Sequence, residues 1–135
     1  MASKNRWTAI LDTFPWKRKG YKMLGRYDST RPADGDRAVL AHMAARGVDF
    51  SRERHVIHYL YFGDDSRRST AEIALRENNY ITRYGADYSD DKPKSLIAER
   101  NGLVNEKIVA EERRLLSAIA EASGGEYDGW EAALD

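Results

Sequence analysis

The sequence predicts an α+β fold built on an antiparallel sheet of four strands. Residues 54–65 read RHVIHYLYFGDD and carry the strongest strand signal in the chain. A helical pattern follows directly, and the later segments read strand, strand, helix, strand. The resulting β-α-β-β-α-β order is that of a ferredoxin-like α/β sandwich.

The first strand, His55–Phe62, is predicted to lie inside the sheet. Because side chains alternate along a strand, Val56, Leu60 and Phe62 share one face with His58. The other face carries Ile57, Tyr59 and Tyr61. Bulky side chains on both faces are typical of an inner strand rather than an edge strand.

The helix after this strand is predicted over residues 66–78. Gly63 ends the strand, and the natural caps for the helix are Asp64, Asp65 and Ser66. Its inward side chains are Ala71, Ala74 and Leu75, and Asn79 suits the left-handed position just past its end. Residues 80–84 and 95–101 read as two strands of a hairpin around the polar turn of residues 89–94.

The longest helix is predicted over residues 106–123, with Asn105 as its N-cap and Val104 and Val109 spaced as a hydrophobic staple. Its apolar stripe consists of Ile108, Val109, Leu115, Leu116 and Ile119. Gly124-Gly125 ends it, and residues 129–134 alternate as a short last strand. Right-handed crossovers then predict the strand order 4-1-3-2 with both helices on one face. The side chains expected in the core are Leu60, Phe62, Leu75, Leu115, Leu116, Ile119 and Trp130.

Extra helices are predicted before the first strand. Asp34-Gly35-Asp36 offers an N-cap for a helix whose apolar stripe is Val39, Leu40, Met43 and Ala44, and Gly47 suits its left-handed end. His42 is expected at its surface or boundary. Further upstream, four apolar residues at helical spacing predict a short helix that ends before Pro15: Trp7, Ile10, Leu11 and Phe14.

Charge divides the chain into two parts. Residues 1–33 hold eight basic and two acidic residues, whereas residues 34–135 hold fourteen basic and twenty acidic ones. We expect residues 1–33 to be a basic extension docked on a body formed by residues 34–135. The alternative is an arm that binds RNA or an anionic surface through its basic residues, among them Lys17, Arg18 and Lys19.

The composition excludes several classes of function. The chain has no cysteine, which rules out disulfides, thiol nucleophiles and thiolate metal sites. No apolar run approaches the roughly 20 residues that span a bilayer, and Asp12 interrupts the apolar patch where a signal peptide would need one. These features predict a soluble protein of the cytoplasm with no membrane association.

No residue pattern predicts catalysis. His55 and His58 are three apart on a strand and therefore point to opposite faces, so they cannot share a metal ion. The chain contains no glycine-rich phosphate loop and no nucleophile motif, and capping explains Asp64 and Asp65. We therefore expect no enzyme activity, no cofactor and no metal.

The β-α-β-β-α-β order also suggests an RNA-binding module, which reads single strands with aromatic residues on its two central strands. Tyr59 and Tyr61 suit the first strand. The third strand, SLIAERN, carries no aromatic residue, and the body is acidic, which disfavours phosphate binding. We do not expect nucleic acid as the partner, although an RNA-binding or other protein-interaction module stays the alternative.

Residues 34–134 resemble the family named for the regulator of ribonuclease E activity B (RraB-type). The resemblance rests on DGDRAVLAHMAARGVDF, on RHVIHYLYFGDD, on the helix that ends in Asn78-Asn79-Tyr80, and on the closing GGEYDGWEAAL. It implies a ferredoxin-like bacterial protein that binds ribonuclease E and restrains RNA decay without catalysis. From the residues themselves, the expected partner-binding side chains are Ile57, Tyr59 and Tyr61, on the face turned away from the helices.

Overall fold

The computed structural model describes residues 33–85 and 93–134. It confirms the α+β class, and the elements follow one another in the predicted order. They are α2 (Ala33–Ala45), β1 (Arg54–Phe62), α3 (Asp65–Glu77), β2 (Ile81–Tyr84), β3 (Lys94–Gly102), α4 (Glu106–Ala122) and β4 (Gly125–Ala132).

β1 is an inner strand of a four-stranded sheet whose order is β2-β3-β1-β4. β1 pairs antiparallel with β3 on one side and with β4 on the other, and β2 pairs antiparallel with β3. This is the strand order predicted from the sequence, and it explains why β1 needs apolar side chains on both faces. The hairpin expected between residues 80–84 and 95–101 is confirmed by the pairing of Ile81 with Glu99 and of Tyr84 with Leu96.

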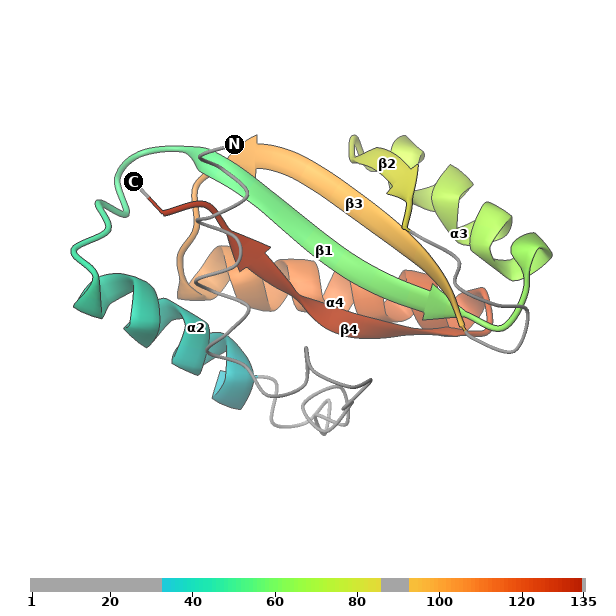
Figure 1. The fold of residues 1–135 in the computed structure, drawn as a ribbon, viewed down its shortest axis with the longest axis horizontal. Helices are drawn as coiled ribbons and strands as arrows, with labels where there is room; N and C mark the ends of the chain where they lie inside the picture. The colour runs from blue at the N-terminus through green and yellow to red at the C-terminus, as the bar shows by residue number, and fades with distance from the viewer. Residues whose placement is uncertain (1–32, 86–92, 135) are drawn as a thin grey trace.

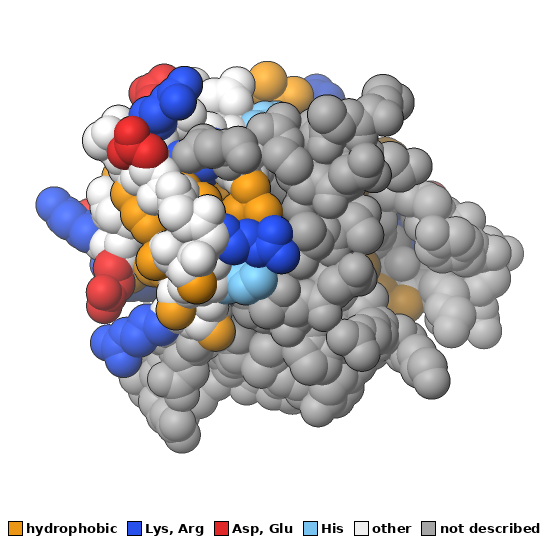
Figure 2. All heavy atoms as spheres, turned by 60° about the vertical axis from the view of Figure 1, so that its left-hand side comes forward, with side chains coloured by type: hydrophobic (Ala, Val, Ile, Leu, Met, Phe, Trp, Pro, Cys, Tyr) orange, Lys and Arg blue, Asp and Glu red, His pale blue; other side chains and the backbone are white. Residues whose placement is uncertain are grey.

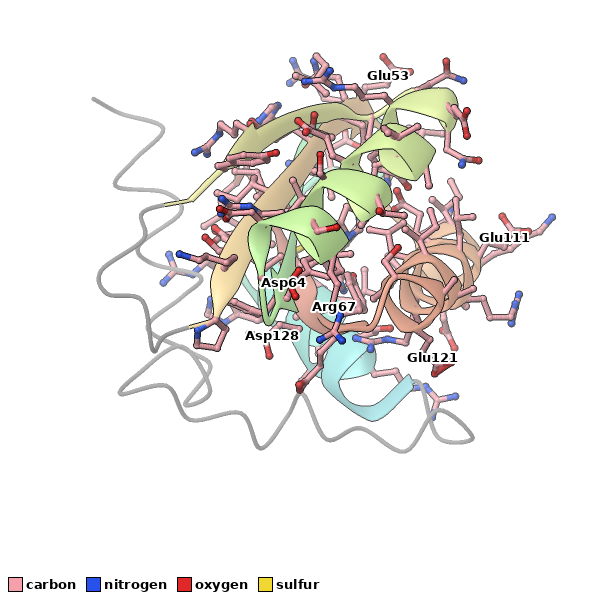
Figure 3. The ribbon with its side chains drawn as sticks, turned by 90° about the vertical axis from the view of Figure 1, so that its right-hand side faces the viewer. Glu53, Asp64, Arg67, Glu111, Glu121 and Asp128 are labelled. Carbon is pink, nitrogen blue, oxygen red and sulfur yellow. The ribbon has the colours of Figure 1, made fainter. Side chains whose placement is uncertain are left out.

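α3 and α4 lie on the same side of the sheet, with α4 running behind the strands in Figure 1. α3 packs against β2 and β3, α4 packs against β4, and the two helices contact each other. α2 packs beside α4. Figure 3 shows this layering from the side, with the sheet next to α3 and α4.

The helix ends follow local chemistry. Asp64 accepts a hydrogen bond from the backbone N–H of Arg67, and Asn105 accepts one from that of Ile108, so both act as N-caps. Gly47 has a φ of 78°, and the N–H of Val48 bonds back to the carbonyl of Met43, which closes α2 with a left-handed turn. Asn79, with a φ of 70°, takes the left-handed position after α3.

Within the described residues, the core between the sheet and the helices forms two clusters. The first joins α2 to the beginning of β1 and the end of the chain: Val39, Met43, Val56, Val104, Val109, Trp130, Ala132 and Leu134. The second joins α3 and α4 to the rest of the sheet: Leu60, Phe62, Ala71, Leu75, Tyr80, Leu96, Ala98, Leu116, Ile119, Ala120 and Tyr127. The staple of Val104 and Val109 is therefore confirmed as part of the first cluster.

The predicted last strand was too short and too regular. β4 begins at Gly125 instead of Gly129. Its pairing with β1 shifts between Tyr59 and Leu60, because Tyr59 pairs with Gly129 whereas Leu60 pairs with Tyr127. The extra residue is Asp128. This β-bulge turns Tyr127 and Trp130, three positions apart, toward the same side of the sheet, which a strict alternation of faces does not allow.

The inward face of α4 also differs from the prediction. Leu116 is fully buried, but Leu115 is only half-buried at the margin of the second cluster. Glu112 and Arg113 are buried on the face that was expected to be apolar. Asp36 was expected among the caps of α2, yet the helix begins at Ala33 and Asp36 is buried inside it. Each of these charged side chains has a partner from a distant part of the chain.

The predictions for residues 7–14, for the basic cluster of residues 17–19 and for most of the turn of residues 89–94 lie outside the described residues. Among the helices that were expected to precede β1, the described part contains α2. No helix in residues 33–85 and 93–134 is long and apolar enough to cross a membrane.

Candidate functional site

The three predicted partner-binding residues lie on one face of β1, turned away from α3 and α4. Strand pairing adds their neighbours, because residues directly opposite each other in an antiparallel sheet share a face. Ile57 pairs with Glu99 and Glu131, Tyr59 with Ile97 and Gly129, and Tyr61 with Ser95 and Glu126. We call this set the tyrosine face, and its larger side chains are Ile57, Tyr59, Tyr61, Ile97, Glu99, Glu126 and Glu131.

The structure buries the members of the tyrosine face to different degrees. Ile57 is 4 % exposed and Ile97 is 7 % exposed, whereas Tyr59 and Tyr61 are half-buried. Ile81 of the edge strand β2 pairs with Glu99 and is 69 % exposed. The accessible part of this face therefore includes the two tyrosine rings, with Ile81 and Arg83 at its margin on β2. Ile57 supports the rings from within the sheet.

A tyrosine and a carboxylate are joined at the centre of this face. The hydroxyl of Tyr59 donates a hydrogen bond to Oε1 of Glu131, which is almost completely buried. Burial first, and then the charge of Glu131, raise the pKa of Tyr59 well above its usual value. Tyr59 therefore keeps its proton at any physiological pH and serves as a donor, while Glu131 serves as an acceptor.

A second polar group lies on β3. Glu99 accepts hydrogen bonds from Nε of Arg83 at 2.6 Å and from Nε2 of His55 at 2.6 Å. Burial by itself would raise the pKa of Glu99, but the bonds from Arg83 and His55 outweigh it and lower the pKa. Glu99 is thus a carboxylate at neutral pH, held in place by side chains from β1 and β2.

The tyrosine face carries more negative than positive charge. Its described residues include three carboxylates, those of Glu99, Glu126 and Glu131, and Arg83 of the neighbouring strand supplies one guanidinium. Such a surface repels nucleic-acid phosphates and attracts basic segments. The position next to Tyr59 on β3 is Ile97, so the second aromatic row of an RNA-binding module has no counterpart here.

A buried polar network that was not predicted from the sequence lies on the helix side of the sheet. The carboxylate of Glu112 accepts hydrogen bonds from the Tyr80 hydroxyl at 2.7 Å and from Nε and Nη2 of Arg100 at 2.5 and 2.6 Å. Nε2 of His58 lies 3.2 Å from the same carboxylate, and its Nδ1 lies 2.8 Å from the Tyr127 hydroxyl. Because a carboxylate only accepts, the proton belongs on Nε2 of His58.

This environment keeps Glu112 charged. Burial alone would raise the pKa of Glu112, but the hydrogen bonds from His58 and Arg100 outweigh it and lower the pKa to about 2. A carboxylate that is ionised above pH 2 and saturated by buried donors offers no proton at neutral pH. The network therefore holds α4 against β1, β3 and Tyr80, the residue that precedes β2.

A second buried ion pair fixes α2. Nε and Nη2 of Arg113 each lie 2.7 Å from one carboxylate oxygen of Asp36, and the indole N–H of Trp130 donates to Oδ1 of Asp36 at 2.9 Å. The bidentate geometry is the strongest arrangement for such a pair. The guanidinium of Arg113 also lies over the ring of Tyr127. Asp36 thus ties α2 to α4 and β4 and caps no helix.

The two histidines of β1 do not meet, as predicted. His55 contacts Glu99 and Asn101 on the tyrosine face, whereas His58 contacts Glu112 on the helix side. Within residues 33–85 and 93–134, no three histidine or carboxylate side chains come together as metal ligands would. Asp64 lies beside Arg67 at the start of α3 (Figure 3), where it caps the helix.

Partly exposed hydrophobic side chains also lie on α2 and in the segment after it. Leu40, Val48 and Phe50 pack against the first core cluster and are half-buried. Figure 2 shows hydrophobic and charged side chains interspersed on this end of the molecule. Scattered apolar atoms of this kind are ordinary on a soluble protein, so the tyrosine face remains the candidate site.

Comparison with known families identifies the chain. Residues 33–132 match the family model described as RraB, regulator of ribonuclease activity B. The matched range contains every described element from α2 to β4. No curated protein matches the chain significantly. The resemblance inferred from the sequence is thereby confirmed, and the chain belongs to the family of regulators of ribonuclease activity B.

Proposed function

We propose that this protein regulates a ribonuclease by binding to it, without catalysing a reaction itself. The main observation in support is the family match over residues 33–132, because members of that family are described as regulators of ribonuclease activity. In keeping with the resemblance, the target is ribonuclease E, the setting is the cytoplasm, and the β-α-β-β-α-β arrangement is a ferredoxin-like sandwich. Fold alone does not define such a role, so the binding surface is inferred from its own residues.

The tyrosine face is the proposed contact surface. Tyr59 and Tyr61 offer ring area with polar tips, which makes tyrosine a frequent anchor of protein interfaces. The excess of carboxylates, of which Glu99 and Glu126 are partly exposed, favours a contact segment of the ribonuclease that is rich in Lys and Arg. The same excess weighs against RNA as the direct ligand.

The test is binding of purified ribonuclease E to the immobilised full chain, together with its rate of RNA cleavage in solution. Tyr61→Ala should weaken binding tenfold or more, because interface tyrosines are typical hot spots. Tyr84→Ala is the matched control, since Tyr84 is 46 % exposed but lies on the helix side of β2, where its hydroxyl bonds Glu72. Tyr59→Ala combined with Tyr61→Ala should abolish both binding and inhibition.

Two results would contradict the proposal. Equal affinity of the Tyr61→Ala and Tyr84→Ala variants would remove the tyrosine face from the interface. Binding of single-stranded RNA by the full chain in the absence of ribonuclease E, lost in the Tyr61→Ala variant, would replace the protein partner by RNA. Circular dichroism melts of all variants show whether a loss of binding reflects a loss of folding.

A further inference from the structure

The tyrosine face is acidic and aromatic, and the same chain contains a segment with the complementary character. Residues 6–22 hold five basic residues and one acidic residue. They also contain the apolar stripe Trp7, Ile10, Leu11 and Phe14, which needs an apolar surface to leave water. The basic and apolar residues of this segment therefore complement the acidic and aromatic residues of the tyrosine face.

The described helices do not cover the tyrosine face, because α2, α3 and α4 all pack on the opposite side of the sheet. The rings of Tyr59 and Tyr61 therefore offer an aromatic surface on which a stripe of apolar side chains can dock.

The connection is long enough. Residues 23–32 join the basic segment to α2 at Ala33, and α2 is held beside β4 by the bonds of Asp36 to Arg113 and Trp130. From there to the outside of β1, a chain crosses two strand spacings and the thickness of a sheet layer, roughly 20 Å. Ten extended residues reach about 33 Å.

We infer that residues 6–22 occupy the tyrosine face of their own chain and compete there with the ribonuclease. The inference rests on the proposed function for the identity of the competitor, but the docking of the segment stands independently of it. Because the segment is tethered, its effective concentration at the face is in the millimolar range. A partner then binds with an affinity reduced by the fraction of molecules in which the face is vacant.

The first experiment adds a synthetic peptide of residues 6–22 to two full-length proteins and measures binding by calorimetry. One is the wild type. The other carries charge reversals within the segment: Lys17→Glu, Arg18→Glu and Lys19→Glu. The peptide should bind the charge-reversed protein at least tenfold more tightly than the wild type, because reversal vacates the face. Raising the salt from 50 to 300 mM should weaken this binding.

A matched control changes three exposed basic residues, one directly after α2 and two on α4, namely Arg46→Glu, Lys107→Glu and Arg114→Glu. This protein has the same net charge as the charge-reversed one and should bind the peptide no better than the wild type. Adding Tyr61→Ala to the charge-reversed protein should remove peptide binding. Should the triple reversal impair folding, Trp7→Ala in the full chain vacates the face by removing an anchor instead.

Several outcomes overturn the inference. The peptide binds neither protein, or it binds both equally, or it binds the control protein as tightly as the charge-reversed one. Sedimentation showing a wild-type dimer and a charge-reversed monomer would assign the segment to a second copy of the chain and would contradict docking within one molecule.

Ribonuclease E binding separates this inference from the proposed function. Tighter binding of the enzyme by the charge-reversed protein, tenfold or more, supports both. Peptide binding without any enzyme binding supports docking and refutes the proposed target. Enzyme binding that is equal for wild type and charge-reversed protein, together with no peptide binding, refutes the docking and leaves the proposed function standing.

Discussion

Removing the charge of Glu112 should lower stability in a way that depends on pH. Glu112→Gln keeps the size of the side chain but takes the anion away from Arg100 and His58. The folded protein lowers the pKa of this carboxyl from 4.5 to about 2. Each unit corresponds to about 1.4 kcal/mol, so the ionised form of Glu112 contributes on the order of 3 kcal/mol to folding at neutral pH.

The sign of the pH dependence follows from the direction of the shift. A carboxyl whose pKa is depressed in the folded state stabilises the fold fully above its unfolded pKa of 4.5. This contribution is lost as the pH falls from 4.5 toward 2. The wild type should therefore exceed Glu112→Gln by about 3 kcal/mol at pH 7, and the gap should shrink steadily below pH 4.5.

Urea unfolding monitored by circular dichroism measures the gap at pH 7, 5, 4, 3 and 2.5. All other carboxylates titrate in both proteins and cancel in the difference. Glu111→Gln is the control, because Glu111 lies one position away on α4 and points into solvent (Figure 3). It should change stability by less than about 0.5 kcal/mol at every pH.

A gap between wild type and Glu112→Gln that stays constant from pH 7 to 2.5 would show that the loss comes from altered packing and not from the charge. No gap at pH 7 would show that the buried network contributes nothing net, as happens when desolvation of the ions cancels their attraction. Either result would refute the reasoning from hydrogen bonds to pKa to stability.

Two further pairs of substitutions test the packing. Leu116→Ala should cost about 2–5 kcal/mol in urea titrations because Leu116 is fully buried, and Leu115→Ala clearly less because Leu115 is half-buried. Equal losses would contradict the inward face that the structure gives α4. Gly125→Ala should destabilise the fold strongly, since its Cβ would lie 2.2 Å from the ring of Phe62, whereas Gly63→Ala meets its nearest atom at an ordinary 3.5 Å. Thermal melts of both glycine variants measure this, and a similar melting temperature for the two would show that β4 can shift away from β1.

The residues of the predicted contact surface were identified from the sequence by the alternation of side chains along a strand alone. Ile57, Tyr59 and Tyr61 share a face because β1 is regular over these residues, and strand geometry requires nothing more. Their burial did not follow from the pattern. Ile57 is enclosed while the tyrosines are half-buried, and the bond from Tyr59 to Glu131 depends on the register between β1 and β4.

The sequence by itself determined the features that depend on neighbours within a few residues. Asp64 and Asn105 cap their helices, and Gly47 and Asn79 end the preceding ones, because a cap bonds backbone groups at most a turn away. The strand order also followed, since right-handed crossovers leave few arrangements for this order of elements.

Only the tertiary structure decided which charged residues are buried. Asp36 and Arg113 are 77 positions apart, so no local pattern relates them. Each charge can be buried only because the other neutralises it and completes its hydrogen bonds. Glu112 likewise needs donors from β1, from β3 and from Tyr80, the residue before β2, to be buried on α4 in place of an apolar residue. The bulge at Asp128 also depends on the tertiary structure, because an extra residue in one strand is defined only by its pairing with the neighbouring strand.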